Sequence, residues 1–133
     1  MQPCTVLVVE DESIILLDLE HSLIEAGFEV VGISRGAEAI AIFDRDPERI
    51  GALVTDIRLG TGPSGWDIAR HVRATNPSLP VIYESADGAE DWGALGVPNS
   101  IMIVKPFVMQ QVITGLATLL NEAGPSLPSA TRT

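Results

Sequence analysis

The sequence predicts an α/β fold, a doubly wound five-stranded parallel sheet between two layers of helices. Short runs rich in Val and Ile are almost continuously apolar, which is typical of strands covered on both faces. Longer amphipathic stretches alternate with these runs, and this alternation favours a parallel sheet. Because crossover connections are right-handed, the expected arrangement is a three-layer sandwich with strand order 2-1-3-4-5.

The expected strands are separated by segments with helical spacing. The strands are Thr5–Val9, Glu29–Ile33, Ala52–Thr55, Val81–Ser85 and Ser100–Val104.

The first expected helix, Ser13–Ala26, repeats apolar side chains every three or four residues and ends at Gly27. Its inward stripe is Ile15, Leu19, Leu23 and Ala26.

The next two expected helices end close to prolines. The helix from Gly36 ends near Asp46, because a residue that precedes proline avoids the α region. The helix Trp66–Ala74 stops before Pro77.

The last expected helix, Val108–Ala123, ends at Gly124. Its expected inward residues are Met109, Val112, Leu116 and Leu120.

The segment Asp87–Val97 is the exception to this regular pattern. Glu90–Leu95 has the length for a turn or two of helix, but the glycines around it predict a short or mobile element. We expect one domain over residues 1–124 and a disordered polar tail over residues 125–133.

Composition excludes several classes of protein. With 18 acidic and 8 basic residues, the formal net charge of −10 argues against nucleic acid or anionic membranes as ligands. A divalent cation or a basic protein surface is the expected partner. No apolar stretch reaches the length of a membrane span, and the apolar run Val6–Val9 leads into acids rather than a cleavage site. The single cysteine, Cys4, agrees with a reducing compartment, so we expect a cytoplasmic protein.

Acidic residues follow two strands that should be neighbours. Glu10 and Asp11 come directly after the first strand, and Asp56 follows the third. In a doubly wound sheet these carboxyl ends meet where the strand order reverses. Clustered carboxylates repel one another, and a divalent cation with oxygen ligands is the usual compensation.

Two further groups should reach the same edge. Lys105, the only lysine of the chain, follows the fifth strand, and Ser85 ends the fourth. Each residue has a plainer interpretation when taken alone. The acids at 10 and 11 could cap a helix, Asp56 and Ser85 could be turn residues, and Lys105 could be solvated. Independent turn residues have no reason to gather at matching ends of four strands, so we favour a common site.

The set supports phosphoryl transfer to a carboxylate. Asp56 is the expected nucleophile, since aspartate can form an acyl phosphate. Mg²⁺ held by Asp11 and Asp56, with Glu10 acting through water, would neutralise the phosphoryl oxygens. Lys105 would bind one of these oxygens as a point charge.

These residues resemble the receiver domain of response regulators in two-component systems, a flavodoxin-like fold. The resemblance covers about residues 5–122 and rests on the run at 6–12, Asp56, Ser85-Ala86 and Lys105-Pro106-Phe107. It implies a stand-alone receiver whose Asp56 is phosphorylated by a histidine kinase or a phosphotransfer protein. It also implies that the protein is not an enzyme, beyond catalysing its own phosphorylation and dephosphorylation.

The resemblance also implies further site roles. The backbone carbonyl of Arg58 would be another Mg²⁺ ligand, Ser85 would be a switch hydroxyl, and the bond between Lys105 and Pro106 would be cis.

Three features depart from the family pattern. Met102 stands where receivers usually carry an aromatic switch residue, and Tyr83 either shares that role or is a core residue. Gly60 replaces the usual proline, in a loop that looks one residue longer than standard. The third departure is the short fourth helix. A smaller group of receivers, with a mobile fourth helix and no aromatic switch, is similar in these respects.

Two apolar surfaces are candidates for protein contacts. Ile14, Leu17 and Ile24 form a second stripe on the first helix, where a kinase helix could dock. Val108 and Leu119 could widen the apolar face of the last helix for homodimerisation. The alternative for both sets is that they flank ordinary core stripes.

Other functions compete with a phosphorylatable receiver that acts on a downstream protein target. A pseudo-receiver would bind proteins without phosphorylation. A phosphohydrolase would need an acid at position 58, which is Arg. A flavin carrier would need a phosphate-binding loop after the first strand, where acids stand instead.

Overall fold

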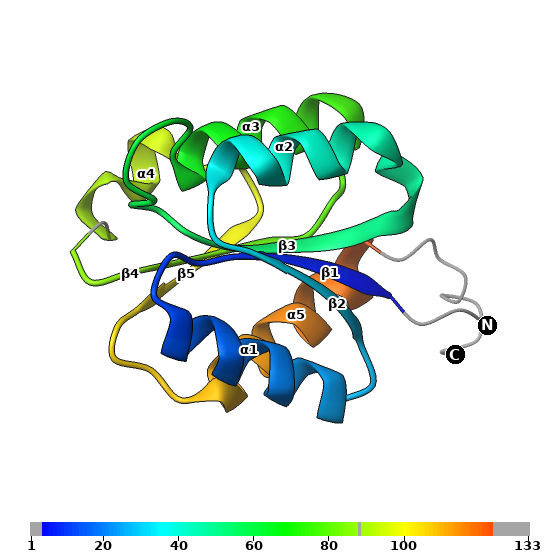
Figure 1. Ribbon diagram of the computed structural model, residues 1–133, viewed down its shortest axis with the longest axis vertical. Coiled ribbons are helices and arrows are strands. Elements are labelled where there is room, and N and C mark those ends of the chain that lie inside the picture. The colour runs from blue at the N-terminus through cyan, green and yellow to red at the C-terminus, as the bar shows by residue number, and fades with distance from the viewer. Residues whose placement is uncertain (1–3, 88, 124–133) are drawn as a thin grey trace.

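The computed structural model describes residues 4–87 and 89–123, which form one parallel sheet covered by helices (Figure 1). The order in the sheet is β2-β1-β3-β4-β5, and every neighbouring pair is parallel. The predicted fold class and strand order are therefore confirmed. The strands are β1 (Thr5–Val9), β2 (Glu29–Ile33), β3 (Ile50–Asp56), β4 (Val81–Ser85) and β5 (Ser100–Val104).

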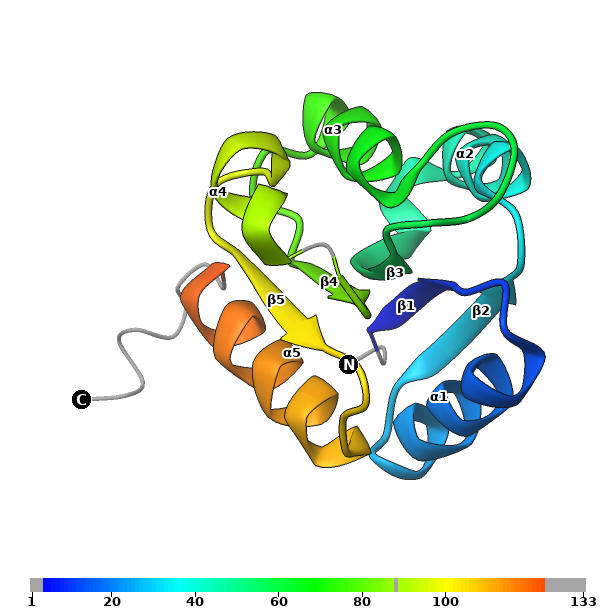
Figure 2. The same ribbon diagram turned by 90° about the vertical axis from the view of Figure 1, so that its left-hand side faces the viewer.

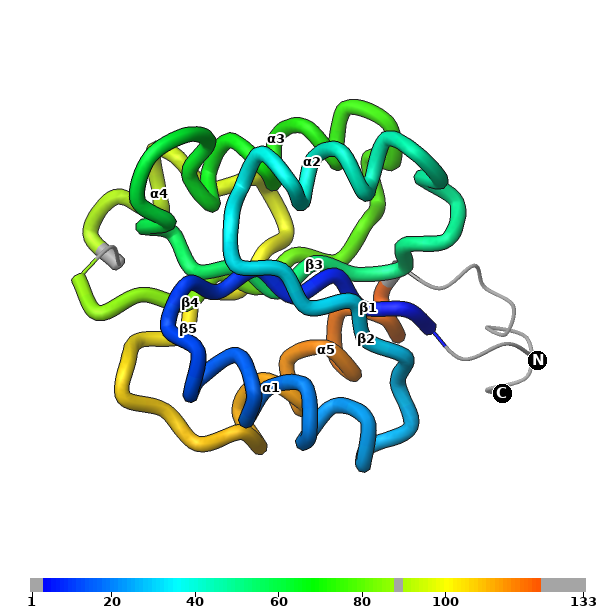
Figure 3. The backbone as a smooth tube through the Cα atoms, viewed as in Figure 1, coloured from blue at the N-terminus to red at the C-terminus, as the bar shows by residue number. Residues whose placement is uncertain are grey.

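The helices form two layers. α1 and α5 cover one face of the sheet, and α2, α3 and α4 lie over the other (Figures 1 and 2). The backbone trace shows the loops after β1, β3, β4 and β5 at the same edge of the sheet (Figure 3). The helices are α1 (Ser13–Glu25), α2 (Gly36–Arg45), α3 (Gly65–Thr75), α4 (Trp92–Leu95) and α5 (Met109–Ala123), with short 3-10 turns η1 (Pro47–Arg49) and η2 (Ala89–Asp91).

A separate hydrophobic core lies on each face of the sheet, because successive strand residues point to opposite sides. On the α1 and α5 side, Val8 of β1 belongs to a core with Leu19 and Leu116. On the other side, Leu7 belongs to a core with Phe43 of α2. Every residue of β1 is buried, which explains its continuously apolar sequence.

The bounds of β3 and α3 differ from the predicted ones. β3 begins at Ile50, paired with Thr5, and ends at Asp56, paired with Glu84, so it exceeds the predicted Ala52–Thr55 at both ends. α3 begins one residue early because the Ser64 hydroxyl accepts a hydrogen bond from the backbone N–H of Asp67, whose carboxylate accepts one in return.

The fourth helix is as short as the sequence predicts. α4 is held by side-chain hydrogen bonds to neighbouring elements: Arg70 of α3 donates to the carbonyl of Leu95 at 3.1 Å, and Trp92 of α4 donates to the Ser100 hydroxyl of β5 at 2.9 Å. The expected mobility of this segment stays a prediction. The expected tail at 125–133, together with residue 124, lies outside the described residues.

The apolar candidates for protein contacts divide into exposed and buried residues. Ile14, Leu17 and Ile24 are 76%, 65% and 58% exposed, so this stripe is surface and does not flank the core. Val108 is also exposed, whereas Leu119 is buried, which agrees with the second of the two alternatives. It lies seven residues after Val112, on the same face of α5, and packs in the core.

Ala26 also departs from its expected position in the inward stripe of α1. The helix ends at Glu25, and Ala26 is exposed just beyond it. Within the described residues, no helix combines the length and the apolar character needed to cross a membrane.

We expect truncation of Leu119 and of Leu17 to have very different effects on the free energy of unfolding. Leu119→Ala should lower the free energy of unfolding by about 2–4 kcal/mol, because it leaves a cavity between α5 and the sheet. Leu17→Ala should change it by less than about 0.5 kcal/mol. Urea denaturation of both variants measures the difference, and equal losses would contradict the assignment of Leu119 to the core.

Candidate functional site

Three carboxylates meet at the edge of the sheet where β1 and β3 end. One oxygen each from Glu10, Asp11 and Asp56 lies within 4.8 Å of the other two. Glu10 and Asp56 are buried, and Asp11 is exposed. The proximity expected from the strand order is therefore present. The neighbouring pairing of Val9 with Thr55 brings the two strand ends level and so positions the acids together.

This donor set fits a magnesium ion. Mg²⁺ prefers oxygen ligands, and all three groups supply carboxylate oxygens. Without a cation the carboxylates repel one another at this distance. Asp11 and Asp56 would hold the ion, with Glu10 beside them.

Lys105 supplies positive charge to the same cluster. Its Nζ lies 2.6 Å from Glu12 Oε1, 3.1 Å from Asp56 Oδ2 and 3.4 Å from Glu10 Oε1. Partial burial lowers the pKa of the ammonium group, but the hydrogen bonds to Glu12 and Asp56 outweigh it and raise the pKa above its usual value. The lysine therefore stays charged. The following peptide bond, Lys105–Pro106, is cis, as expected.

A fourth acid, Glu84, is buried beneath the cluster. It belongs to β4, is fully inaccessible to solvent and is the register neighbour of Asp56. Burial raises the pKa of Glu84, and contact with Glu10 raises it further. Burial also raises the pKa of Glu10, although hydrogen bonds from Glu84 and from the Glu12 backbone oppose this effect.

The remaining predicted site residues lie at the ends of β3 and β4. The buried Ser85 hydroxyl accepts a hydrogen bond from the backbone N–H of Asp87 at 3.2 Å. The backbone N–H of Arg58 donates to Asp56 Oδ1 at 3.2 Å, and its guanidinium group pairs with Asp87 at 2.9 Å. The switch role of Ser85 and the ligand role of the Arg58 carbonyl stay predictions.

Comparison with known families agrees with this geometry. Residues 6–117 match the model of the response regulator receiver domain. The chain belongs to this receiver family. Receiver domains of this family interact with kinases or phosphotransfer proteins, and phosphorylation and Mg²⁺ binding are general features of it.

Known proteins resemble this receiver over most of its length. The probable transcriptional regulatory protein TcrX of Mycobacterium tuberculosis is 34% identical over 92% of this chain and 52% of its own length. The phosphate regulon regulatory protein PhoB of Rhizobium meliloti is 33% identical over 93% of this chain and 55% of its own. The receiver thus spans about half the length of these regulators. Because they regulate transcription, the expectation that nucleic acid is not a partner stays a prediction.

Solved receiver structures have the same fold. A response regulator receiver protein from Sinorhizobium medicae superposes with a TM-score of 0.89, at 41% identity over 92% of this chain and 98% of its own. The receiver domain of sensor histidine kinase PA1611 from Pseudomonas aeruginosa has a TM-score of 0.73 at 22% identity, over 92% of this chain and 99% of its own. That structure carries a magnesium ion in its active-site cleft.

The two candidate switch residues of this receiver differ in their surroundings. Tyr83 is fully buried, and its hydroxyl accepts a hydrogen bond from the backbone N–H of Val97 at 3.0 Å. Its ring also packs against Trp66, with centroids 4.7 Å apart. Tyr83 is thus a core residue, the second of the two alternatives. Met102 is half-buried against the same core, and a switch role for it stays a prediction.

The loop between β3 and α3 folds back tightly beside Asp56. Gly60 and Gly62 adopt positive φ angles of 78° and 91°, which glycine adopts readily. Gly65 packs against the backbone of Asp56 so closely that a Cβ atom would meet its carbonyl oxygen. This approach allows α3 to begin directly behind the end of β3.

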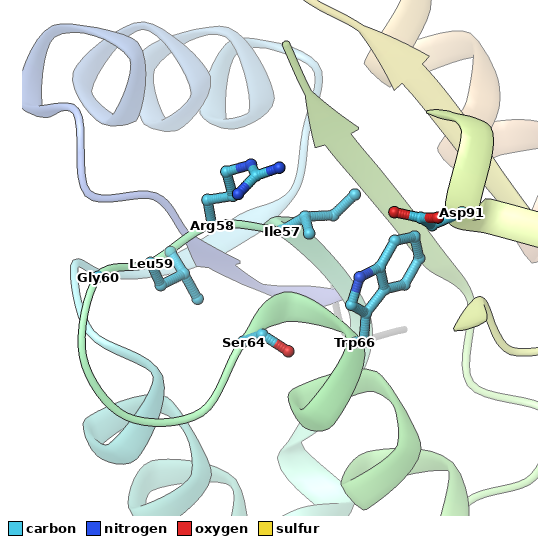
Figure 4. A pocket seen from close by; sticks show the side chains of 7 residues that line it. All are labelled: Ile57, Arg58, Leu59, Gly60, Ser64, Trp66 and Asp91. Atoms are coloured by element: carbon cyan, nitrogen blue, oxygen red, sulfur yellow. The ribbon is translucent and has the colours of Figure 1, made fainter. Parts of the chain in front are cut away.

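A hollow of about 480 Å³ opens next to this loop (Figure 4). Trp66 and Ile57 contribute apolar surface, while Arg58 and Asp91 contribute charge. It lies between the loop and η2, beside the acids rather than around them. The seven lining residues are Ile57, Arg58, Leu59, Gly60, Ser64, Trp66 and Asp91.

Two members of the charge cluster were absent from the predicted site. Glu12 follows the predicted pair directly, but its contact with Lys105 depends on the path of the loop after β5. The sequence does contain an indication of Glu84, because it is the only charged residue within the strand Val81–Ser85. An acid inside a strand that is buried on both faces needs a partner.

We expect Mg²⁺ to stabilise the folded protein through this site. At a free concentration 100 times its dissociation constant, the ion should raise the free energy of unfolding by about 2.7 kcal/mol. Asp11→Asn should lose most of this gain. In the presence of a chelator it should be at least as stable as the wild type, because one repulsive charge is gone.

Urea denaturation with Mg²⁺ or with EDTA, at matched ionic strength, measures both effects. Glu48→Gln, an exposed change at the opposite end of β3, is the control and should keep the full gain. A gain of the same size in Asp11→Asn would exclude this residue from the metal site.

Proposed function

We propose that the protein accepts a phosphoryl group on Asp56 in a Mg²⁺-dependent reaction with a histidine kinase or a histidine phosphotransfer protein. It then signals through contacts with a downstream protein, or acts as a phosphate shuttle or sink. It catalyses only its own phosphorylation and dephosphorylation.

One observation carries this proposal: the Asp56 carboxylate lies beside both the acids that suit a cation and the single lysine. Lys105 Nζ is 3.1 Å from Asp56 Oδ2, and the oxygen ligands of Glu10 and Asp11 are within 4.8 Å. Such a setting provides positive charge on both sides of a transferring phosphoryl group. Phosphoryl transfer depends mainly on this kind of positioning and charge stabilisation.

Each residue of the site has a separate role in the proposed reaction. A carboxylate oxygen of Asp56 forms a bond to phosphorus while the bond from phosphorus to the donor's imidazole nitrogen breaks. Lys105 then exchanges its contact with Asp56 for one with a phosphoryl oxygen, and Ser85 donates its hydroxyl to another. Asp11 and Asp56 would hold a magnesium ion, whose charge would neutralise the phosphoryl oxygens.

Partner recognition is proposed to use the exposed stripe on α1. Ile14 and Leu17 lie on the first turns of α1, immediately after the acids, so a partner that reaches Asp56 passes over them. Exposed apolar side chains in such a row suit a helix of the partner.

Two finer points belong to the same proposal. The stand-alone role is supported by the receiver protein of Sinorhizobium medicae, 98% of which this chain covers. A cytoplasmic location is supported by the lone cysteine, Cys4, which cannot form an internal disulfide.

We expect acetyl phosphate with Mg²⁺ to add one phosphoryl group to the wild type. Asp56→Asn should remain unlabelled because it lacks the nucleophile, and Lys105→Ala should be labelled at least about tenfold more slowly. Intact-mass spectrometry with and without the donor, repeated with EDTA, measures each case. A wild type that stays unlabelled while binding its partner would favour the pseudo-receiver instead.

We expect Leu17→Glu to slow phosphoryl transfer from a phosphorylated histidine kinase by about tenfold or more, because it puts charge into an apolar contact. Labelling by acetyl phosphate should change less than about twofold. Val108→Glu adds the same charge at an equally exposed valine and serves as the control. Equal slowing by both variants would exclude a specific role for α1.

A further inference from the structure

The hollow beside Asp56 contains a hydrogen-bond donor that has no acceptor. Trp66, the second residue of α3, is only 8% exposed, yet its indole N–H donates to no group of the described residues. The ring nitrogen lies on the side of the indole that faces the hollow (Figure 4). The other tryptophan, Trp92, does have a partner, the Ser100 hydroxyl at 2.9 Å. Because buried donors are almost always paired, Trp66 indicates that another molecule supplies the acceptor.

The lining of the hollow limits what that molecule presents. Ile57, Leu59 and the Trp66 ring form an apolar wall, which an apolar side chain covers best. A group that displaces water from the indole N–H without replacing its hydrogen bond leaves the donor unsatisfied. The entering segment must therefore combine an apolar side chain with an acceptor, and a backbone carbonyl beside that side chain meets both needs.

The charge at the rim selects the sign of the neighbouring group. The Arg58 guanidinium group is already paired with Asp87 at 2.9 Å. Asp91 also lines the hollow, and it forms no ion pair with a basic group of the described residues. Glu90, which precedes it, is exposed, and the whole chain has a formal net charge of −10. A basic residue therefore suits this rim, whereas an acidic one is repelled.

The hollow and the apolar stripe on α1 lie on different sides of Asp56. Three of the lining residues, 57–59, follow Asp56 directly in the chain, and α3 and α4 belong to the helix layer opposite α1 (Figure 2). A protein that brings a phosphohistidine to Asp56 while contacting α1 has the rim of the hollow within its reach.

We propose that this hollow is a docking pocket for one segment of the phosphodonor protein: an apolar side chain next to a basic residue, with a backbone carbonyl that accepts the indole N–H of Trp66. The basic residue lies beside Asp91. This inference rests on the proposed function and adds a second contact with the same partner.

The first test uses blocked dipeptides as probes of the unphosphorylated full chain. Acetyl-leucyl-lysine amide has the apolar side chain, the basic residue and the carbonyl. Acetyl-leucyl-glutamate amide reverses the charge, and acetyl-seryl-lysine amide lacks the apolar side chain. Nuclear magnetic resonance of isotope-labelled protein follows the two indole N–H signals, of which Trp92 is the internal reference. The variant Trp92→Phe assigns them.

We expect acetyl-leucyl-lysine amide to move the Trp66 signal downfield with a dissociation constant of roughly 1 mM, and to leave the Trp92 signal in place. The glutamate peptide should bind at least about threefold more weakly, and the serine peptide at least about fivefold more weakly. Trp66→Phe keeps a ring but loses the donor, so its affinity should fall about threefold. The backbone amide of Gly60 follows binding in that variant, and urea denaturation shows that it is folded.

A transfer assay tests whether the phosphodonor protein uses the pocket. The measured quantity is the rate of transfer from a phosphorylated histidine kinase divided by the rate of labelling with acetyl phosphate. Asp91→Lys should lower this ratio by at least about tenfold, because the reversed charge repels the basic residue of the partner. Glu48→Lys makes the same change of charge at an exposed position at the opposite end of β3. It is the matched control and should keep the ratio.

The outcomes separate this inference from the proposed function. A Trp66 signal that no peptide moves, or equal binding of all three peptides, would overturn the docking pocket. A Trp66 signal that moves with protein concentration alone would assign the hollow to a second copy of this chain instead. Peptide binding with an unchanged ratio in Asp91→Lys would exclude the phosphodonor as the occupant. All of these results leave the proposed function in place, because labelling of Asp56 by acetyl phosphate is measured separately.

Discussion

Repulsion between carboxylates at one sheet edge is the constraint on which the rest of this structure depends. Glu10, Asp11 and Asp56 present oxygens within 4.8 Å of one another, and the only lysine of the chain is their principal counter-charge. Such a cluster opposes folding unless a cation, a hydrogen bond or a proton compensates each charge. The parallel sheet provides the rigid support that keeps the acids together in spite of this repulsion.

The members of the charge cluster come from different elements, so the site depends on the whole fold. Lys105 follows β5 and crosses to the acids of β1 and β3, while Glu84 is buried beneath them in β4. The proposed phosphoryl transfer requires the negative charge of these acids to be compensated. A phosphoryl group is itself an anion, so a site of this kind accepts one only when positive charge is also present.

The surroundings of the candidate switch residues differ from the pattern expected for the family. Met102 stands at the position where receivers usually carry an aromatic residue. The neighbouring aromatic residue, Tyr83, is held in the core by packing against Trp66 and by a hydrogen bond from the Val97 N–H. α4 has only four residues and is held by arginine and tryptophan side chains rather than by an amphipathic face of its own.

The sequence by itself determined the alternation of strands and helices, the strand order, and the edge at which Asp11, Asp56 and Lys105 meet. These features follow from side-chain periodicity and from the right-handed crossover, which are local or general properties of the chain. Only the tertiary structure decided that Leu119 faces the core, that Glu12 pairs with Lys105 and that Glu84 lies against Glu10. Those contacts depend on side-chain directions and on neighbours from distant parts of the sequence, which spacing along the chain does not encode.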